Sequence, residues 1–480
     1  MSERITLIGP HPNRASRVAR WAVVLLVAGL IWNYPVPPNV EPRGWQLLAI
    51  FAATVTGMLL QPLPVGALVL LSLTVAVLTG SITLQFALSG FATPVMWLIT
   101  AAFMIARAVV HTGLGRRVAL LFVSWFGSSS LRLGYALAAA DVVVAPVIPS
   151  DTARVAGVIF PITRSLAENY QSFPGETARK LGSYLMQCAY HVGCTTSAIF
   201  MTSMAANAVS VDLAAKHAGV KITWLSWLAA SCVPAIVSVL GLPLLIYKLD
   251  PPELTKTPEA QQLAREHLRG MGGASYAERG LVTILTLMLL GWATQPWHGL
   301  HPVIVAFAGL AGMVLSGVME WDELLGERRA WDVLIWLGAM IMMADGLQAT
   351  GVISAFSEEV GRDMQGLPWL PAFVLLILGY TYVHYVFASM TAHITALYAA
   401  FLLLALAAGV PPMIAAVALA FFSCLNASLT HYGTAPGPIF FGAGYVTQTT
   451  WWRVGFFVMA FQLFAWLGVG LVWWKVLGLW

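Results

Sequence analysis

The chain has 480 residues, of which 59% are hydrophobic and only 10% are charged. A soluble globular protein carries about 25% charged residues, so this chain cannot cover a water-facing surface of ordinary size. The formal net charge of +4 is small and is spread along the chain, which argues against a nucleic-acid partner. The composition and the long apolar runs therefore indicate an all-α polytopic membrane protein.

Several apolar runs are long enough to cross a bilayer, which needs about 20 such residues. The first run, roughly 20–34, follows Arg14, Arg17 and Arg20. We interpret it as a retained helix, because no small-residue cleavage site of a signal peptide follows it. About 11 crossings are expected, and they lie near 20–34, 44–60, 64–80, 93–111, 181–212, 222–247, 277–296, 300–318, 331–350, 411–445 and 454–475.

Two further apolar stretches, 131–166 and 367–409, are long but are interrupted by polar residues. We expect each to form a re-entrant helical hairpin that enters and leaves the membrane on the same side. With the N-terminus in the cytoplasm, this topology places most Arg and Lys residues on cytoplasmic loops, as the positive-inside rule requires. A full crossing at either hairpin would reverse the side of every later loop and weaken this bias.

The two halves of the chain resemble each other on either side of a charged linker at 248–279. The segment "VMWLITAAFMIARAVVHTGLG" (95–115) is similar to "VLIWLGAMIMMADGLQATGV" (333–352), and Gly113 aligns with Gly351 at an offset of 238. Further along, "PSDTAR" (149–154) aligns with "ASMTAH" (388–393) at an offset of 239. Two matches at nearly one offset predict an internal repeat. Because its copies start on opposite sides, the repeat is expected to be inverted, as in many secondary transporters.

The polar tip of the first hairpin is "VIPSDTARVAG" (147–157). Pro149 ends the incoming helix, Ser150 or Asp151 can cap the next one, and Thr152 lies in its first turn. A helix that starts within the membrane presents free N–H groups and a positive dipole end, which favour an anion. The second tip repeats the pattern at Ser389, Met390 and Thr391. Two such helix starts suit a ligand with a carboxylate at each end. The alternative is that the Ser and Thr hydroxyls only cap their helices or bond to backbone carbonyls of the preceding turn.

Each tip is followed by a small and polar stretch inside an apolar segment. These stretches are "HVGCTTSAIFMTSMAANAV" (191–209) and "LNASLTHYGTAPGPIFFGAG" (425–444). We interpret them as broken helices that line a cavity; close packing of helices through small residues is the alternative. The candidate substrate-binding residues on them are Thr195, Thr196, Asn207, Asn426, Thr430, Thr434, Pro436 and Gly437.

Arg154 and His393 hold matched positions in the two copies of the repeat. An ionisable residue within a membrane is a functional candidate by default. An ion pair between Arg154 and Asp151 is the structural alternative, and a neutral, hydrogen-bonded ring is the alternative for His393. The four cysteines form no CxxC pair and are expected to be small buried hydrophobic residues. No metal site and no cofactor are expected.

These tips resemble the divalent anion:sodium symporter family, which carries two Ser-Asn-Thr hairpin motifs in inverted repeats. Ser150, Asp151 and Thr152 match the first motif, and Ser389, Met390 and Thr391 match the second. The resemblance implies a homodimer in a bacterial inner membrane, in which a transport domain moves past a scaffold as an elevator. The implied parts are N-terminal scaffold helices (1–130), a first transport half (131–247, with hairpin 131–166 and broken helix 181–212), the linker (248–279), second scaffold helices (280–366) and a second transport half (367–480, with hairpin 367–409 and broken helix 411–445).

Both motifs depart from the family pattern at the middle Asn. In this respect the second tip is similar to the exchanger branch, which includes citrate/succinate and tartrate/succinate antiporters and the plastid 2-oxoglutarate/malate translocator. Met390 cannot coordinate a hard cation. We therefore expect a sodium-independent exchanger of di- or tricarboxylates, in which Arg154, with or without a protonated His393, replaces the bound cation.

A sodium-coupled dicarboxylate symporter remains the alternative, because Asp151 can retain one ion. An enzyme is not expected, because HExxH, GxSxG and paired carboxylates are absent from the sequence. A channel would not need the repeat.

Overall fold

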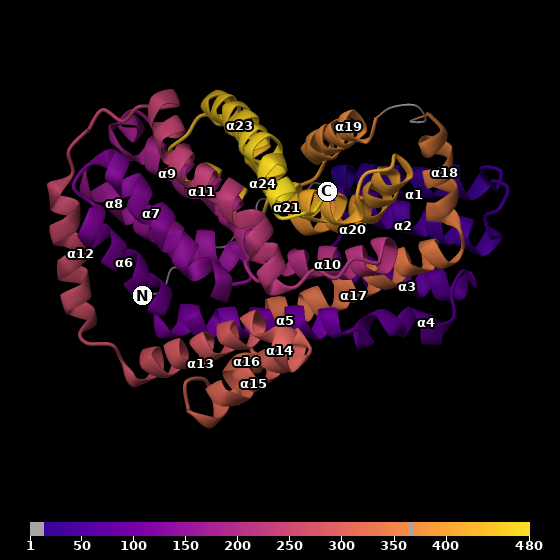
Figure 1. Ribbon diagram of the computed structural model, residues 1–480, viewed down its shortest axis with the longest axis horizontal. Helices are drawn as coiled ribbons and strands as arrows, with labels where there is room; N and C mark the ends of the chain where they lie inside the picture. Colours follow the sequence, from indigo (N-terminus) through magenta and orange to yellow (C-terminus); the bar gives the residue numbers. More distant parts are fainter. Residues whose placement is uncertain (1–13, 364–367) are drawn as a thin grey trace. The chain divides into compact units, whose positions relative to one another are not determined.

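The computed structural model describes residues 14–363 and 368–480 (Figure 1). Helices dominate this part of the chain, which contains no β-strand and only an isolated antiparallel bridge between Ser129 and Lys256. Ten of the helices there are long and apolar enough to cross a membrane. The all-α fold predicted from composition is therefore confirmed.

The order of helices in the first half recurs in the second half. Both α5 and α17 end in a turn at a glycine, Gly113 with φ 77° and Gly351 with φ 79°, a left-handed conformation that suits glycine best. The first series is α5 (Pro94–Thr112), α6 (Leu114–Phe126), α7 (Ser130–Val144), the π-helix η3 (Thr152–Ile159) with α8 (Phe160–Asn169), α9 (Gly182–Ile199), α10 (Ala205–Ala218) and α11 (Trp224–Leu249). The second series is α17 (Arg328–Ala349), α18 (Val352–Asp363), α19 (Trp369–Tyr382), α20 (Met390–Ala407), α21 (Pro412–Leu425), α22 (Pro436–Gly442), and α23 (Gln448–Leu463) with the π-helix η7 (Phe464–Val469) and α24 (Gly470–Val476).

One compact unit comprises residues 14–93 and 335–356 of the described chain. Small residues let its helices approach closely: a Cβ added to Gly44 would lie 2.2 Å from Oγ1 of Thr350. The backbone N–H of Glu41 donates to the carbonyl of Thr350 at 3.2 Å. Close approach through glycine is a common way to pack membrane helices. Its remaining elements are α1 (Arg14–Asn33), α2 (Pro42–Leu60), α3 (Val65–Leu78), α4 (Leu84–Ser89) and η1 (Gly90–Ala92).

The second compact unit comprises residues 94–334 and 357–480. Its centre is α9, every residue of which is buried. Helices α7, α8, α11 and α21 pack against α9, and Figure 1 shows α7, α9 and α11 side by side. A helix enclosed on all sides has no water-facing stripe, which explains why this segment carries no Asp, Glu, Lys or Arg and is mostly apolar or small.

The segment between the two halves contains a helix, α12 (Pro258–Met271), that the sequence reading left as a linker. It packs against α6. The hydroxyl of Tyr170, at the end of α8, donates to Oε2 of Glu259 at 3.0 Å and accepts from the N–H of Ala260 at 2.8 Å. Tyr170 therefore joins the first hairpin to α12. Beyond α12 follow α13 (Tyr276–Ala293), α14 (Gln295–His298), α15 (Pro302–Leu315) and α16 (Trp321–Leu325).

The other end of α12 is held by Arg117 on α6. Its Nε donates to Oε1 of Glu278 at 2.6 Å, and its Nη2 donates to Oε2 at 3.0 Å. Nη1 also donates to the carbonyl of Gly272 at 3.0 Å. Only 3% of the Glu278 side chain is exposed, so this bidentate pair compensates an almost buried carboxylate.

The expected division into scaffold and transport parts stays a prediction. Its ranges include residues 1–13 and 364–367, which lie outside the described chain.

Replacing Arg117 with Met should lower the apparent melting temperature of the detergent-purified protein by several degrees. The substitution keeps most of the side-chain volume but leaves Glu278 buried without its partner, a loss of up to about 3–5 kcal/mol. The neighbouring, exposed Arg116→Met is the matched control and should melt like the wild type. Equal melting temperatures for the two variants would contradict the anchoring role of Arg117.

Candidate functional site

The first tip begins its second arm with a serine cap. Helix α7 is followed by η2 (Ala145–Val147) and a non-helical turn. Oγ of Ser150 then accepts from the N–H of Ala153 at 3.2 Å, and Oδ1 of Asp151 accepts from the N–H of Thr152 at 2.8 Å. The helix that follows, η3, has wide π-type turns, which often occur at functional sites. This geometry was not predicted from the sequence.

The second tip is built in the same way. Helix α19 is followed by η5 (Val383–Val386), and α20 begins at Met390. Oγ of Ser389 accepts from the N–H of Ala392 at 3.3 Å. Both motif serines thus bond to the N–H three residues ahead, as capping residues do. The duplicated motif sets two equivalent helix starts.

The structure brings the two tips together around one cavity of about 320 Å³. This volume is within the range of small-molecule sites. Thr434 and Ala435, from the break after α21, join its wall, as do Met204 and Ala205 from the break after α9. The motif residues that line it are Ser150, Asp151, Thr152, Ser389, Met390 and Thr391.

Asp151 connects the first tip to the second broken helix. The Oγ1 hydroxyl of Thr434 donates to Oδ2 of Asp151. The hydroxyl of Tyr190 on α9 donates to the carbonyls of Ala427 at 2.9 Å and Thr430 at 3.1 Å. The cavity is therefore assembled from both copies of the repeat.

Both predicted helix breaks are present. Helix α9 ends at Ile199 and α10 begins at Ala205, while α21 continues as η6 (Asn426–Leu429) before α22 begins at Pro436. A Cβ added to Gly437 would lie 2.5 Å from the carbonyl oxygen of His431, so glycine permits this return of the chain.

Several of the predicted binding residues hold the breaks together away from the cavity. Nδ2 of Asn207 donates to the carbonyls of Ser197 at 2.9 Å and Phe200 at 3.2 Å. Oγ1 of Thr195 accepts from Nε2 of Gln462 at 2.5 Å. Of the residues predicted on the broken helices, Thr434 is the one that lines the tip cavity; Thr195, Thr196, Asn207, Asn426, Thr430, Pro436 and Gly437 lie outside its lining.

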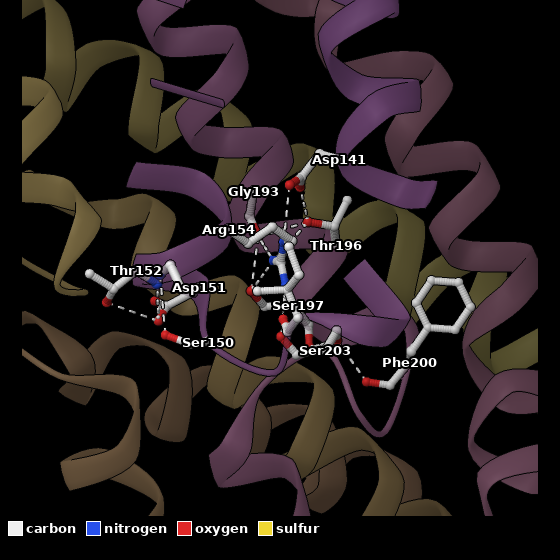
Figure 2. Close-up of polar contacts among 12 residues, drawn as sticks. Asp141, Ser150, Asp151, Thr152, Arg154, Gly193, Thr196, Ser197, Phe200 and Ser203 are labelled. Carbon is white, nitrogen blue, oxygen red and sulfur yellow. Dashed lines mark hydrogen bonds and ion pairs between the residues drawn. The ribbon is translucent and has the colours of Figure 1, made fainter. Parts of the chain in front are cut away.

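Arg154 is completely buried and does not line the cavity. Its Nε donates to Oδ1 of Asp141 at 3.0 Å. In Figure 2 the guanidinium lies among residues of α7 and α9, apart from the Ser150–Thr152 turn. Its other N–H groups donate to the carbonyls of Ile148, Gly193 and Ser203 and to the hydroxyls of Thr196 and Ser197.

These contacts correct two expectations. The ion-pair partner of Arg154 is Asp141, on the other arm of the hairpin, and not Asp151. A guanidinium whose donors are all occupied has none left for a substrate, so direct contact between Arg154 and a ligand is not what the structure shows. The signal for Asp141 was an acidic residue within an apolar helix, which the sequence reading did not use.

His393 is also buried, in a small polar cluster. Its Nδ1 lies 3.1 Å from Nδ1 of His384 and 2.7 Å from Nδ2 of Asn426. Nε2 of His384 lies 2.8 Å from the carbonyl oxygen of Gly433, so that nitrogen is the protonated donor. His393 therefore lies at the second helix break and outside the lining of the tip cavity.

Two residues at the cavity were missed by the sequence reading. Arg329 and Asp332 lie in the first turns of α17 and line the cavity opposite the tips. Arg329 precedes the predicted span 331–350, so its charge was assigned to a loop, whereas Asp332 lies at the start of that span and was not considered.

Comparison with known proteins identifies the family. The sequence model described as the sodium:sulfate symporter transmembrane region matches residues 15–480. The chain belongs to the sodium:sulfate symporter family. The resemblance to divalent anion:sodium symporters is thus confirmed, and the protein is a multi-pass membrane transporter and not an enzyme.

Relatives in this family cover almost the whole chain. The chain is 44% identical to the putative malate transporter YflS of Bacillus subtilis, over 95% of this chain and 96% of the relative. It is 43% identical to dicarboxylate transporter 1, chloroplastic, of Spinacia oleracea, over 98% of this chain and 83% of the relative. The crystal structure of the YdaH transporter of Alcanivorax borkumensis has a similar fold, with a TM-score of 0.58, 14% identity and 97% coverage of both chains.

Removing either partner of the Arg154–Asp141 pair should destabilise the protein strongly. We expect Asp141→Asn and Arg154→Gln each to cost about 3–5 kcal/mol, because each leaves one charge buried without compensation. The double variant should lose clearly less than the sum of the two, since it leaves no net charge. Thermal unfolding of the four proteins in detergent measures this cycle, and additive losses would exclude a direct pair.

Proposed function

We propose that this protein exchanges di- or tricarboxylates across a bacterial inner membrane without sodium. The single observation that carries the proposal is the cavity between two serine-capped helix starts, one from each copy of the repeat. In this proposal the N-terminus is cytoplasmic, the protein is a homodimer, and the tips move across the membrane as an elevator.

The chemistry of the cavity favours an anion with two charged ends. Residues of the helix starts at η3 and α20 line the cavity, and each helix start carries a positive dipole end. The hydroxyl of Thr391 adds a donor at the second tip, and that of Thr152 lies at the first tip, where it donates to Oδ1 of Asp151 at 3.4 Å. A carboxylate bound at each helix start is the arrangement these groups match. The printed names of the relatives, a malate transporter and a dicarboxylate transporter, support this class of substrate.

The surroundings of Arg154 support sodium independence. Three backbone carbonyls and two hydroxyls converge on its guanidinium. Oxygen atoms of this kind are the ligands that a hard cation such as a sodium ion prefers. Because arginine stays protonated, the side chain acts as a permanently bound cation and holds the break of α9 against the first tip. Met390 supplies no oxygen at the second tip.

Obligatory exchange follows from the state of the empty site. Without a ligand, the two positive helix ends, and any N–H or hydroxyl donor that the caps leave unpaired, would cross an apolar barrier, at a cost of a few kcal/mol for each unpaired group. A bound dianion satisfies both helix starts at once. The loaded form therefore crosses more readily than the empty form, and uptake of one anion is coupled to export of another.

One observation favours the alternative, a sodium-coupled dicarboxylate symporter. At the second break, Oδ1 of Asn426, Oγ of Ser428 and Oγ1 of Thr430 are buried and have no hydrogen-bond partner among the described residues. These oxygens are of the type that binds a sodium ion or an ordered water. Sodium dependence separates the two functions directly.

Purified protein in liposomes preloaded with unlabelled succinate should take up labelled succinate, and empty liposomes should not support uptake. The rate should be the same in sodium and in choline buffers, because Arg154 replaces the ion. Uptake that requires a sodium gradient would contradict sodium-independent exchange and support the sodium-coupled symporter. The absence of binding and uptake for C4, C5 and C6 acids would refute a carboxylate transporter.

Thr391→Val should raise the KM for succinate about tenfold, because one donor to a charged carboxylate is lost while the side-chain volume is kept. Thr395→Val is the matched control one turn further along α20. The Thr395 hydroxyl donates to the carbonyl oxygens of Thr391, at 3.0 Å, and Ala392, at 3.1 Å, within its own helix. Kinetics that are indistinguishable between the two variants would remove Thr391 from the site.

A further inference from the structure

Three cavities of the second compact unit adjoin and lead away from the tips. A cavity of about 430 Å³ shares Phe103, Ser150, Thr152 and Arg329 with the tip cavity, so the two meet. A third cavity, of about 480 Å³, shares Val110 and Gly157 with the second. It reaches Leu263, Ala264 and His267 on α12. The run of cavities therefore follows the η3 wall from the tips to the segment that joins the two halves.

Basic side chains occur at each stage of this run. Arg116 lines the outer cavity, Arg107 lines the middle one, and Arg329 lines both the middle and the tip cavities. The lining of the outer cavity contains no acidic residue. At the tip cavity Arg329 is the one basic lining residue and is exposed, but Asp151 and Asp332 also line it, so the excess of cationic side chains lies in the outer and middle cavities. A cleft with cationic walls concentrates anions and speeds their association.

The acidic residues along the run of cavities differ in the hydrogen bonds and ion pairs that they make. The Asp151 carboxylate accepts hydrogen bonds from Thr152 and Thr434, and Asp332 lines the tip cavity beside Arg329. Glu327 faces Arg107, with Oε2 at 3.5 Å from Nη1. Its other oxygen, Oε1, accepts from the N–H of Arg329 at 3.2 Å.

The Arg107–Glu327 pair is loose enough to be displaced. A separation of 3.5 Å exceeds that of a good charge-assisted hydrogen bond. The Arg107 side chain is 38% exposed, and its Nε is buried without a partner among the described residues. A carboxylate that arrives in the middle cavity can take two donors of Arg107 at once, a geometry that Glu327 does not achieve.

We infer that Arg116, Arg107 and Arg329 form the entry path of the dianion, and that Glu327 competes with the substrate for Arg107. The inference rests on the proposed function and deepens it by naming residues of α5, α6 and α17 that receive the anion before the tips do. Arg329, at the junction of the middle and tip cavities, is the last cation on the path. Charge on these three side chains sets how fast the anion reaches the helix starts.

The first experiment compares Arg329→Gln with Arg328→Gln, its neighbour on α17. Arg328 lies outside the lining of all three cavities, so the pair has equal net charge and differs only in position. Arg329→Gln should raise the KM for succinate about tenfold and flatten its dependence on ionic strength, whereas Arg328→Gln should behave like the wild type. Equal kinetics for the two variants would overturn the path.

The second experiment removes the charge of either member of the Arg107–Glu327 pair, and the two variants should change KM in opposite directions. Glu327→Gln keeps the oxygen that accepts from the Arg329 N–H but removes the competing charge, so it should lower KM severalfold. Arg107→Gln should raise KM. Should Arg107→Gln fail to fold, the Glu327→Gln result decides alone, because an unchanged or raised KM would contradict competition.

A binding measurement separates this inference from the proposed function. Succinate and sulfate should each raise the melting temperature of the purified wild type and the Arg328→Gln variant more than that of Arg329→Gln. This result supports the path even if the protein turns out not to exchange substrates. Conversely, active exchange with identical anion binding in Arg329→Gln and Arg328→Gln would leave the proposed function standing and refute the path.

Discussion

Every helix that is broken inside a membrane leaves backbone carbonyl and N–H groups that lipid cannot satisfy. In this protein, side chains from neighbouring helices satisfy the carbonyls at both breaks. Arg154 donates to the carbonyl of Ser203 in the first break, and also to those of Ile148 at the first tip and Gly193 within α9. Tyr190 donates to the carbonyls of Ala427 and Thr430 at the second. The tips and their cavity depend on these internal donors.

The two halves use different chemistry for the same task. The donor at the first break is charged, and its charge requires Asp141 in the same apolar interior. The donors at the second break, Tyr190 and His384, act through a hydroxyl and a ring nitrogen. The two copies of the repeat therefore share a backbone pattern but differ in their electrostatics. The serine caps are the same in both copies, but the middle residues of the motifs, Asp151 and Met390, differ in charge where they line the cavity.

Much of the architecture could be predicted because it depends on local patterns. The offsets of the repeated glycine and of the repeated tips predicted two matched helix starts, and the small polar stretches predicted both breaks. The partner of Arg154 could not be predicted in this way, since Asp141 lies on the opposite arm of the hairpin and becomes a neighbour only when the arms pack. Arg329 was missed for a similar reason. Its local context is that of a loop, and its place beside the tips is set by tertiary packing.

The attachments of α12 also determine where the segment between the two halves can bend. Tyr170 fixes the beginning of this helix to the first hairpin, and Arg117 contacts the carbonyl beyond its end. Pro251 and Pro252 stiffen the peptide before it. At the other end, Gly272 has a φ of 67°, and a Cβ added to it or to Gly273 would meet no atom within 4 Å. Arg117 also holds the carbonyls of both glycines, so a displacement of the hairpin that carried α12 along would have to break these contacts before the chain could turn at the glycine pair.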